Sequence, residues 1–280
     1  MILIADSGST KCTWAQCLTN GEIKQYHHTV GFNPKYTNYD DLVNELKNSS
    51  LSEIKHLVSE VYFYGAGCSS KSRNQVLEDP LQSFFKNADI NIRHDLEAAL
   101  KATYQGTQII SCILGTGSNS CIFDGKKIIE NAPSLGFILG DEGSGNYFGK
   151  QLINAYVNKQ LPSHINKKCE NTTNERADDI IKNIYNLQRP NLYLASFFRF
   201  MYENKEEPFF NNIFNKGIQH FFDLHIKCFD NYQKYPLTFI GSVAFYLSDY
   251  INEIATKEGV QVQCIIQSPI NNLVKKHFKV

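Results

Sequence analysis

The first indication of the fold is the segment Ile2-Leu3-Ile4-Ala5-Asp6-Ser7-Gly8-Ser9-Thr10-Lys11. Its first four residues are apolar, and a run rich in branched aliphatic residues predicts a buried strand. The Gly, Ser and Thr residues that follow favour a turn whose backbone N–H groups come close to an anion. Asp6, at the end of the strand, supplies the kind of oxygen that Mg²⁺ prefers and could hold that ion through water. An ordinary hairpin turn explains the same residues, so this segment alone leaves both interpretations open.

A second copy of this pattern begins at Ile109. The apolar run Ile109–Leu114 is followed by Gly115-Thr116-Gly117-Ser118-Asn119-Ser120. Each copy continues into a second strand-like segment and then into a hairpin dipeptide, which is Asn20-Gly21 in the first copy and Asp124-Gly125 in the second. Two such units predict a duplicated domain with one phosphate-binding loop in each copy. The repetition is a sharper signal than either loop alone.

Composition narrows the class of protein. A chain of 280 residues can form one large or two medium domains with an ample core. Its 28 basic and 28 acidic residues cancel, so we expect no nucleic-acid partner and no anionic membrane partner. No stretch resembles a signal peptide or reaches the length of a membrane span. The eight cysteines form no C-x-x-C pair, which indicates buried reduced thiols in a cytoplasmic protein.

We expect an α/β fold divided near residue 107. Residues 1–107 would form the first domain, and residues 108–280 would form a second domain with a helical insertion. The sequence leaves open whether the last predicted helix, Pro269–Phe278, packs back on the first domain. Within the polar stretch 162–190, Thr172 and Glu175 have the spacing of a capping box and predict a helix that runs to Tyr185. The aromatic residues that follow this stretch are most simply core, namely Phe210, Phe214, Phe221, Phe222 and Phe229.

Asp95 stands where a predicted strand, Ile90–Arg93, meets a predicted helix, Leu96–Tyr104. Ligands in α/β sheets collect at the carboxyl ends of strands, so the position suits a catalytic base. An aspartate that caps the helix explains the same residue without any chemistry. The local sequence does not distinguish a catalytic base from a helix cap.

The segment Leu135–Gly145 carries two acids, Asp141 and Glu142, between glycines. Glycines placed in this way indicate a tight backbone path beside something bulky. The alternative is a pair of acids placed favourably near a helix N-terminus. Two nearby patterns do not complete a nucleotide motif: Gly65-Ala66-Gly67 lacks the third glycine of a dinucleotide fingerprint, and Gly149-Lys150 lacks the first glycine of a Walker A loop.

Two further residues stand at positions that suit a ligand. Asn33 precedes Pro34 and is expected to be extended, with its amide free to point into a cleft or engaged in a turn. Gly241 follows the predicted strand Leu237–Ile240, where the absence of a side chain would let a flat ring lie against the backbone. An ordinary turn is the alternative for Gly241.

Together these motifs resemble a known superfamily. Asp6–Thr10, Gly115–Asn119 and Gly241–Ala244 resemble, in this order, the phosphate-1, phosphate-2 and adenosine motifs of the sugar kinase and actin-like ATPase superfamily. Asp95 and Gly140-Asp141-Glu142-Gly143-Ser144 resemble the N-acetylglucosamine kinase branch of the BadF/BadG-type ATPase family. The resemblance spans most of the chain, least clearly residues 162–235. It implies two ribonuclease-H-like domains that close on ATP and a sugar.

The resemblance also implies a reaction and a set of site residues. The protein would transfer phosphate from ATP to an amino sugar, most simply N-acetylglucosamine, with Asp95 as the base and Mg²⁺ near Asp6. The residues implied for ATP are Gly8, Ser9, Thr10, Lys11, Gly115, Thr116, Gly117, Gly241 and Ser242. Those implied for the amino sugar are Asn33, Asp95, Ser118, Asn119, Gly136 and Asp141. Where the family commonly has Gly-Gly-Trp-Gly, this chain has Pro133-Ser134-Leu135-Gly136, which leaves the identity of the sugar open.

Two other functions stay open at this stage. Other members of the family are ATPases that activate a dehydratase by electron transfer, through an iron–sulfur cluster held by cysteines of both subunits of a dimer. Cys112 and Cys121 are the nearest pair here, and Cys112 lies inside a predicted buried strand. The second alternative is a sugar or nucleotide sensor without catalysis. The sequence also leaves open whether the protein forms a homodimer.

Overall fold

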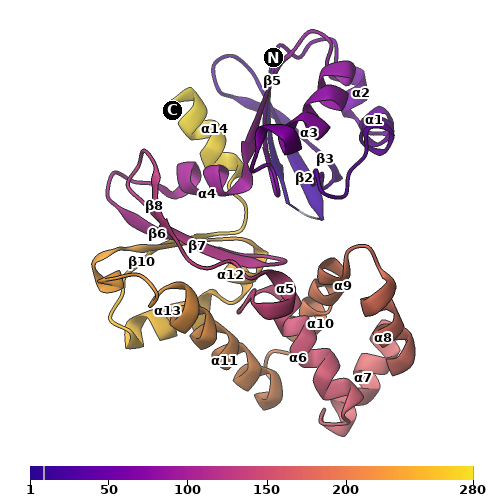
Figure 1. Ribbon diagram of the computed structural model, residues 1–280, viewed down its shortest axis with the longest axis vertical. Helices are drawn as coiled ribbons and strands as arrows, with labels where there is room; N and C mark the ends of the chain where they lie inside the picture. The colour runs from indigo at the N-terminus through magenta and orange to yellow at the C-terminus, as the bar shows by residue number, and fades with distance from the viewer. Residues whose placement is uncertain (9, 280) are drawn as a thin grey trace. The chain divides into compact units, whose positions relative to one another are not determined.

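The computed structural model describes residues 1–8 and 10–279, so Ser9 lies outside the described residues (Figure 1). The chain divides into two compact units. The first unit consists of Met1–Gln105 together with Ser268–Val280, and the second consists of Gly106–Gln267. The C-terminal segment from Ser268 therefore belongs to the same unit as the N-terminus.

The first unit is built on a five-stranded sheet with the strand order β3-β2-β1-β4-β5. The central strand β1 pairs antiparallel with β2 and parallel with β4. Because β1 is buried on both faces, its residues form the continuous apolar run that opens the sequence. The strands are β1 Ile2–Ser7, β2 Lys11–Cys17, β3 Ile23–Val30, β4 Glu60–Gly65 and β5 Asp89–His94.

Helices cover both faces of this sheet. Leu3 and Ala5 of β1 face a core shared with α1 and α3, in which Trp14 and Phe63 are fully buried. The helices α4 and α14 pack on each other and on β1 from the other side (Figure 1). The helices of this unit are α1 Tyr39–Asn48, α2 Leu51–Ile54, α3 Lys71–Phe84, α4 Asp95–Thr103 and α14 Ile270–Phe278.

The second unit repeats the topology of the first. Its sheet has the order β10-β9-β6-β7-β8, and the central strand β6 pairs antiparallel with β7 and parallel with β9. Each unit thus has a central strand with an antiparallel hairpin on one side and parallel strands on the other. This confirms the duplicated α/β fold predicted from the repeated motif. The strands are β6 Ile109–Leu114, β7 Ser118–Phe123, β8 Ile128–Asn131, β9 Leu237–Ile240 and β10 Val262–Ile266.

The helices of the second unit form its large aromatic core. The predicted aromatic residues Phe210, Phe214, Phe221, Phe222 and Phe229 are all buried, as expected. The helices are α5 Gly136–Leu139, α6 Gly145–Val157, α7 Ser163–Thr173, α8 Ala177–Asn186, α9 Pro190–Ser196, α10 Phe198–Glu203, α11 Pro208–His225, α12 Ser242–Tyr246 and α13 Ser248–Lys257, with a 3-10 turn at Tyr232–Lys234. The segment 192–202 is therefore divided between two helices, and the long helix that begins at Pro208 ends at His225.

The capping box predicted at Thr172 and Glu175 is wrong. Thr172 lies in the last turn of α7, and its hydroxyl donates to the Lys168 carbonyl at 2.8 Å. Asn174 then ends α7 in the left-handed conformation, with φ 50°, and Arg176 is the N-cap residue of α8. The Thr172 hydroxyl is therefore hydrogen-bonded within α7 and does not cap the N-terminus of α8.

The cysteines are all free, and six of the eight are buried. Cys112 and Cys121 are fully buried in neighbouring strands, so the fold offers no surface on which this pair could share a cluster with a second subunit. Within residues 1–8 and 10–279, no helix combines the length and apolar character needed to cross a membrane.

Candidate active site

The carboxyl ends of β1, β4 and β5 meet at one edge of the first sheet. Ser7 of β1 is in register with Gly65 of β4, and Gly65 is in register with His94 of β5. Asp6 and Asp95 therefore lie at the same sheet edge, where their charges interact. Strand register therefore brings together the predicted metal residue, Asp6, and the predicted base, Asp95, although they are 89 positions apart in the sequence.

Asp6 has the surroundings of a cation ligand. Burial raises the pKa of its carboxyl to about 6, a hydrogen bond from Ser268 and the charge of Lys11 lower it, and the charge of Asp95 raises it. The Ser268 hydroxyl donates to Asp6 Oδ2 at 3.1 Å. Mg²⁺ is commonly held by one or two carboxylates with waters and phosphates, and its charge would offset both the burial of Asp6 and the neighbouring negative charge. These residues therefore fit the predicted ion. Ser268 was missed by the sequence analysis, because only the fold brings α14 beside β1.

Asp95 is the first residue of α4, and His94 is the N-cap residue. Asp95 is therefore not the N-cap residue of α4, which lies one position earlier. His94 Nδ1 lies 2.8 Å from Asp95 Oδ1, and the Leu96 N–H donates to the same oxygen at 2.9 Å. The hydrogen bond with Asp95 raises the pKa of His94. Within the described residues no hydrogen bond reaches Asp95 Oδ2, so one oxygen is fixed and the other is free to accept a proton.

The first glycine loop and Asn33 lie near the end of β1. The Gly8 N–H donates to the Lys11 carbonyl at 3.0 Å, which ties the end of β1 to the start of β2. The Phe32 N–H donates to Ser7 Oγ at 3.0 Å and so ties the Asn33 turn to β1. Asn33 Oδ1 accepts from the Lys35 N–H at 3.0 Å. This oxygen is therefore engaged in a turn, as in the second of the two interpretations given for Asn33. Thr10 and Lys11 are exposed at the start of β2.

In the second unit the 115–117 loop is attached to the beginning of α6. The Gly145 N–H donates to the Gly115 carbonyl at 2.8 Å, and the Asn146 N–H donates to the Thr116 carbonyl at 3.1 Å. Gly241 lies against the same loop, since a Cβ atom there would be 2.2 Å from the Leu114 carbonyl oxygen. Its φ of +123° also disfavours any side chain. The predicted phosphate-2 and adenosine residues are therefore neighbours.

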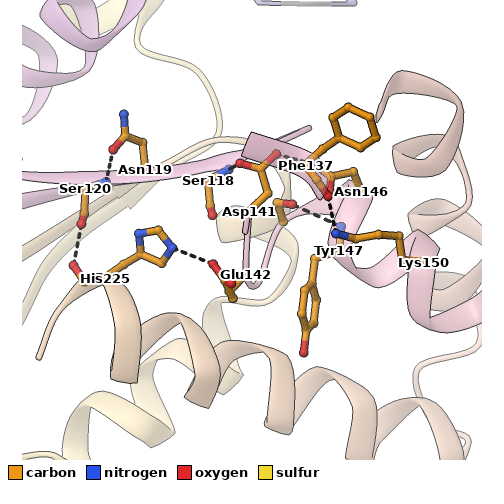
Figure 2. A network of polar contacts seen from close by, with 11 residues as sticks. Ser118, Asn119, Ser120, Phe137, Asp141, Glu142, Asn146, Tyr147, Lys150 and His225 are labelled. Atoms are coloured by element: carbon orange, nitrogen blue, oxygen red, sulfur yellow. Dashed lines mark hydrogen bonds and ion pairs between the residues drawn. The ribbon is translucent and has the colours of Figure 1, made fainter. Parts of the chain in front are cut away.

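The acidic loop meets this glycine loop through Asp141 (Figure 2). Asp141 Oδ1 accepts from the Ser118 N–H at 3.3 Å, and Oδ2 accepts from Asn146 Nδ2 at 2.7 Å. Asn146 Nδ2 also donates to the Thr116 carbonyl at 2.6 Å. Ser118 and Asp141, both predicted for the sugar, are thus brought beside Thr116, which is predicted for ATP. Asn146 was missed, and its place just after Ser144-Gly145 is the only local signal that could have pointed to it.

Two further contacts anchor the acidic loop (Figure 2). Glu142 Oε2 lies 3.0 Å from His225 Nε2 of α11, and both side chains are nearly fully buried. Lys150 Nζ of α6 donates to the Phe137 carbonyl at 2.5 Å. Burial lowers the pKa of Lys150, and the charges of Asp141 and Glu142 raise it. The loop is therefore held from two helices.

The predicted residues Asn119, Gly136 and Ser242 make no hydrogen bond to Asp141 among the described residues. Asn119 Oδ1 accepts from the neighbouring Ser120 N–H at 2.8 Å. Gly136 opens the short helix α5 with φ +70° and is exposed. Ser242 is the exposed first residue of α12.

Comparison with solved structures identifies relatives over the whole chain. The putative N-acetylglucosamine kinase of Porphyromonas gingivalis is 32% identical, with a TM-score of 0.92, and the match covers 100% of this chain and 99% of that one. The putative N-acetylglucosamine kinase of Chromobacterium violaceum is 11% identical, with a TM-score of 0.72 and 98% of each chain covered. A ROK family glucokinase from Streptomyces griseus, solved with glucose and AMPPNP, is 15% identical, with a TM-score of 0.55, and the match covers 98% of this chain and 97% of that one.

The latter two likenesses show the fold alone, whereas the first shows the family. No protein-family model matches the chain, and no curated protein matches it. The full-length match at 32% identity agrees with the order of motifs along the sequence and with the repeated sheet topology. The chain belongs to the N-acetylglucosamine kinase family of the sugar kinase and actin-like ATPase superfamily, and is an ATP-dependent carbohydrate kinase.

Proposed function

We propose that this protein transfers the γ-phosphoryl group of ATP to a hydroxyl of N-acetylglucosamine or a close amino sugar. The observation that carries the proposal is the full-length match to the Porphyromonas gingivalis protein, whose name gives N-acetylglucosamine as the substrate. The free oxygen of Asp95 supports it, because phosphoryl transfer to an alcohol needs a carboxylate that can accept the proton of the hydroxyl.

Asp95 is the proposed base. Its Oδ1 is engaged by His94 and by the Leu96 N–H, so the carboxylate has one orientation and presents Oδ2. The side chain is 31% exposed, which leaves it open to a sugar hydroxyl. A positioned base of this kind typically contributes about 10²–10⁴-fold to the rate.

The remaining site residues have binding roles in this proposal. Mg²⁺, when bound near Asp6, would neutralise charge on the ATP phosphates. The backbone N–H groups of the loops at Gly8–Lys11 and Gly115–Gly117 would bind phosphate oxygens, and Gly241 with Ser242 would accept the adenosine. For the amino sugar we assign Asn33 and Asp95 in the first unit and Ser118, Asn119, Gly136 and Asp141 in the second.

A panel of sugars tests the proposal. N-acetylglucosamine, N-acetylmannosamine, glucosamine and glucose would each be incubated with the protein, ATP and Mg²⁺, and both ADP and sugar phosphate would be measured by mass spectrometry. We expect stoichiometric ADP and sugar phosphate with at least one amino sugar. A reaction without sugar measures background hydrolysis, and Asp95→Asn serves as the matched inactive control.

The other outcomes point elsewhere. ATP hydrolysis that no sugar increases, with no sugar phosphate formed, would favour the ATPase alternative. Tight binding of a sugar or nucleotide without turnover would favour a sensor. Absence of turnover with every amino sugar in the panel would contradict the proposed function.

A further inference from the structure

Asn146 makes three hydrogen bonds to residues of the candidate site, although no motif indicates it. We propose that Asn146 is a positioning residue, which fixes the Asp141 carboxylate for the amino sugar and ties it to the 115–117 loop. This inference rests on the proposed function for the role of Asp141, but the geometry that carries it does not depend on the substrate.

The hydrogen bonds of Asn146 fix the orientation of its side chain. Asn146 is fully buried at the start of α6, so its polar atoms cannot exchange partners with bulk water. Nδ2 lies 2.6 Å from the Thr116 carbonyl oxygen and 2.7 Å from Asp141 Oδ2. Both partners are acceptors, and the amide nitrogen has two hydrogens, so both are satisfied at once. The flipped amide would place an acceptor against two acceptors, and it is therefore excluded.

The Asp141 carboxylate has few other supports. Its second oxygen accepts only the longer, 3.3 Å hydrogen bond from the Ser118 N–H among the described residues. Its backbone is in the left-handed conformation, with φ 59°, which is uncommon for a residue other than glycine. Gly117 faces the carboxylate so closely that a Cβ atom there would lie 2.9 Å from Asp141 Oδ2. Without Asn146, the carboxylate would keep one weak bond and a strained backbone.

The consequence is a direct link between two functional elements. Through one amide, Asn146 joins a backbone carbonyl of the predicted ATP loop to the carboxylate predicted to hold the sugar. The Asn146 N–H and the Gly145 N–H add two bonds from α6 to the same loop. The beginning of α6 therefore acts as a common support for both elements.

Binding measurements with a double-mutant cycle test this role. The variants are Asn146→Ala, Asp141→Ala and the double variant, each titrated calorimetrically with N-acetylglucosamine. We expect Asn146→Ala to weaken sugar binding about 10-fold, the effect typical of losing a hydrogen bond to a charged group. In the Asp141→Ala background the same change should have no further effect, because Asn146 acts through Asp141. Equal effects in both backgrounds would overturn the proposal.

A second readout needs no substrate. If Asn146 holds Asp141, then Asn146→Ala should speed hydrogen exchange of the Ser118 amide about 10-fold, while the Ile122 amide near the other end of β7 exchanges as before. Asn154→Ala, at an exposed position on the same helix, is the matched control and should change neither amide. Unchanged Ser118 exchange in Asn146→Ala would overturn the positioning role.

The two readouts separate the two proposals. Faster Ser118 exchange in a protein that binds no amino sugar would support the positioning role and contradict the proposed substrate. If Asn146→Ala does not fold, Asn146→Leu keeps the approximate size of the side chain but has no group that could donate to the Asp141 carboxylate. The same faster Ser118 exchange is expected of that variant, and its absence would count against the proposal.

Discussion

Replacing Asp6 by asparagine should stabilise the protein while removing its proposed cation ligand. Burial raises the pKa of Asp6 from 3.8 to about 6. Between these values the folded state holds a proton that the unfolded state has released, so the free energy of unfolding falls as pH rises. Above about pH 6, Asp6 is ionised in both the folded and the unfolded state, and the unfolding free energy falls no further. Asp6→Asn removes this pH dependence and keeps an oxygen that can accept from the Ser268 hydroxyl.

The size of the effect follows from the shift in pKa. A shift from 3.8 to about 6 corresponds to about 3 kcal/mol at 1.36 kcal/mol per unit. The side chain has intermediate exposure, so water screens part of this cost. We therefore expect Asp6→Asn to exceed the parent in unfolding free energy by about 1–3 kcal/mol at pH 7, and by much less at pH 4.

Urea unfolding of both proteins from pH 4 to pH 8, without Mg²⁺, measures this difference. Asp89→Asn is the matched control, since Asp89 is exposed and begins β5, at the end of the strand away from the candidate site. Magnesium ADP should raise the melting temperature of the parent but not that of Asp6→Asn, because a ligand stabilises only the state that binds it. Parallel stability curves for parent and Asp6→Asn across this pH range would show that folding does not raise the pKa of Asp6.

Three more variants give distinct expectations. Asp95→Asn should keep the unfolding free energy within ~1 kcal/mol, because an amide oxygen still accepts from the helix N–H, while turnover falls by ~10²-fold or more; a fully active variant would exclude the base. His225→Ala leaves the Glu142 carboxylate buried without its partner, so it should lower the unfolding free energy by about 3 kcal/mol in urea titrations. Glu142→Gln should lower it less, because no buried charge is left unpaired, and equal losses in the two variants would contradict this expectation. Lys150→Met removes the donor to the Phe137 carbonyl and should cost about 1–3 kcal/mol of stability, with Lys150→Arg as the control; an unchanged midpoint would show that this bond is not needed.

Most of the fold could be predicted because its decisive features are local and repeated. The central strands β1 and β6 are buried on both faces, which gives each a continuous apolar run. The same hairpin signal follows each of them. The polar region 162–190 was harder, because Thr172 has the sequence of a cap but lies within the last turn of another helix. Capping motifs compete in such stretches, and tertiary packing decides which one is used.

The candidate site was predictable only where a motif carries the chemistry. Asp6, Asp95 and Asp141 stand beside glycines or at strand ends, and the sequence marks them. Their partners have no such mark. Ser268 meets Asp6 across a sequence separation of 262 residues, and His225 meets Glu142 across 83. A serine in a loop or a histidine in a helix is common, so only the folded chain shows which one contacts the site.

The duplication explains why Asp6 has a partner from the far end of the chain. In the first unit, β5 is followed by α4, and in the repeat the equivalent strand β10 is followed by α14. Both helices pack in the first unit, on each other and on β1. The strand–helix junction of each copy therefore comes to the same carboxylate: the first supplies the charge of Asp95, and the second supplies the hydroxyl of Ser268. One raises the pKa of Asp6 and the other lowers it, so the two copies of one structural element act in opposite directions on the proposed cation ligand.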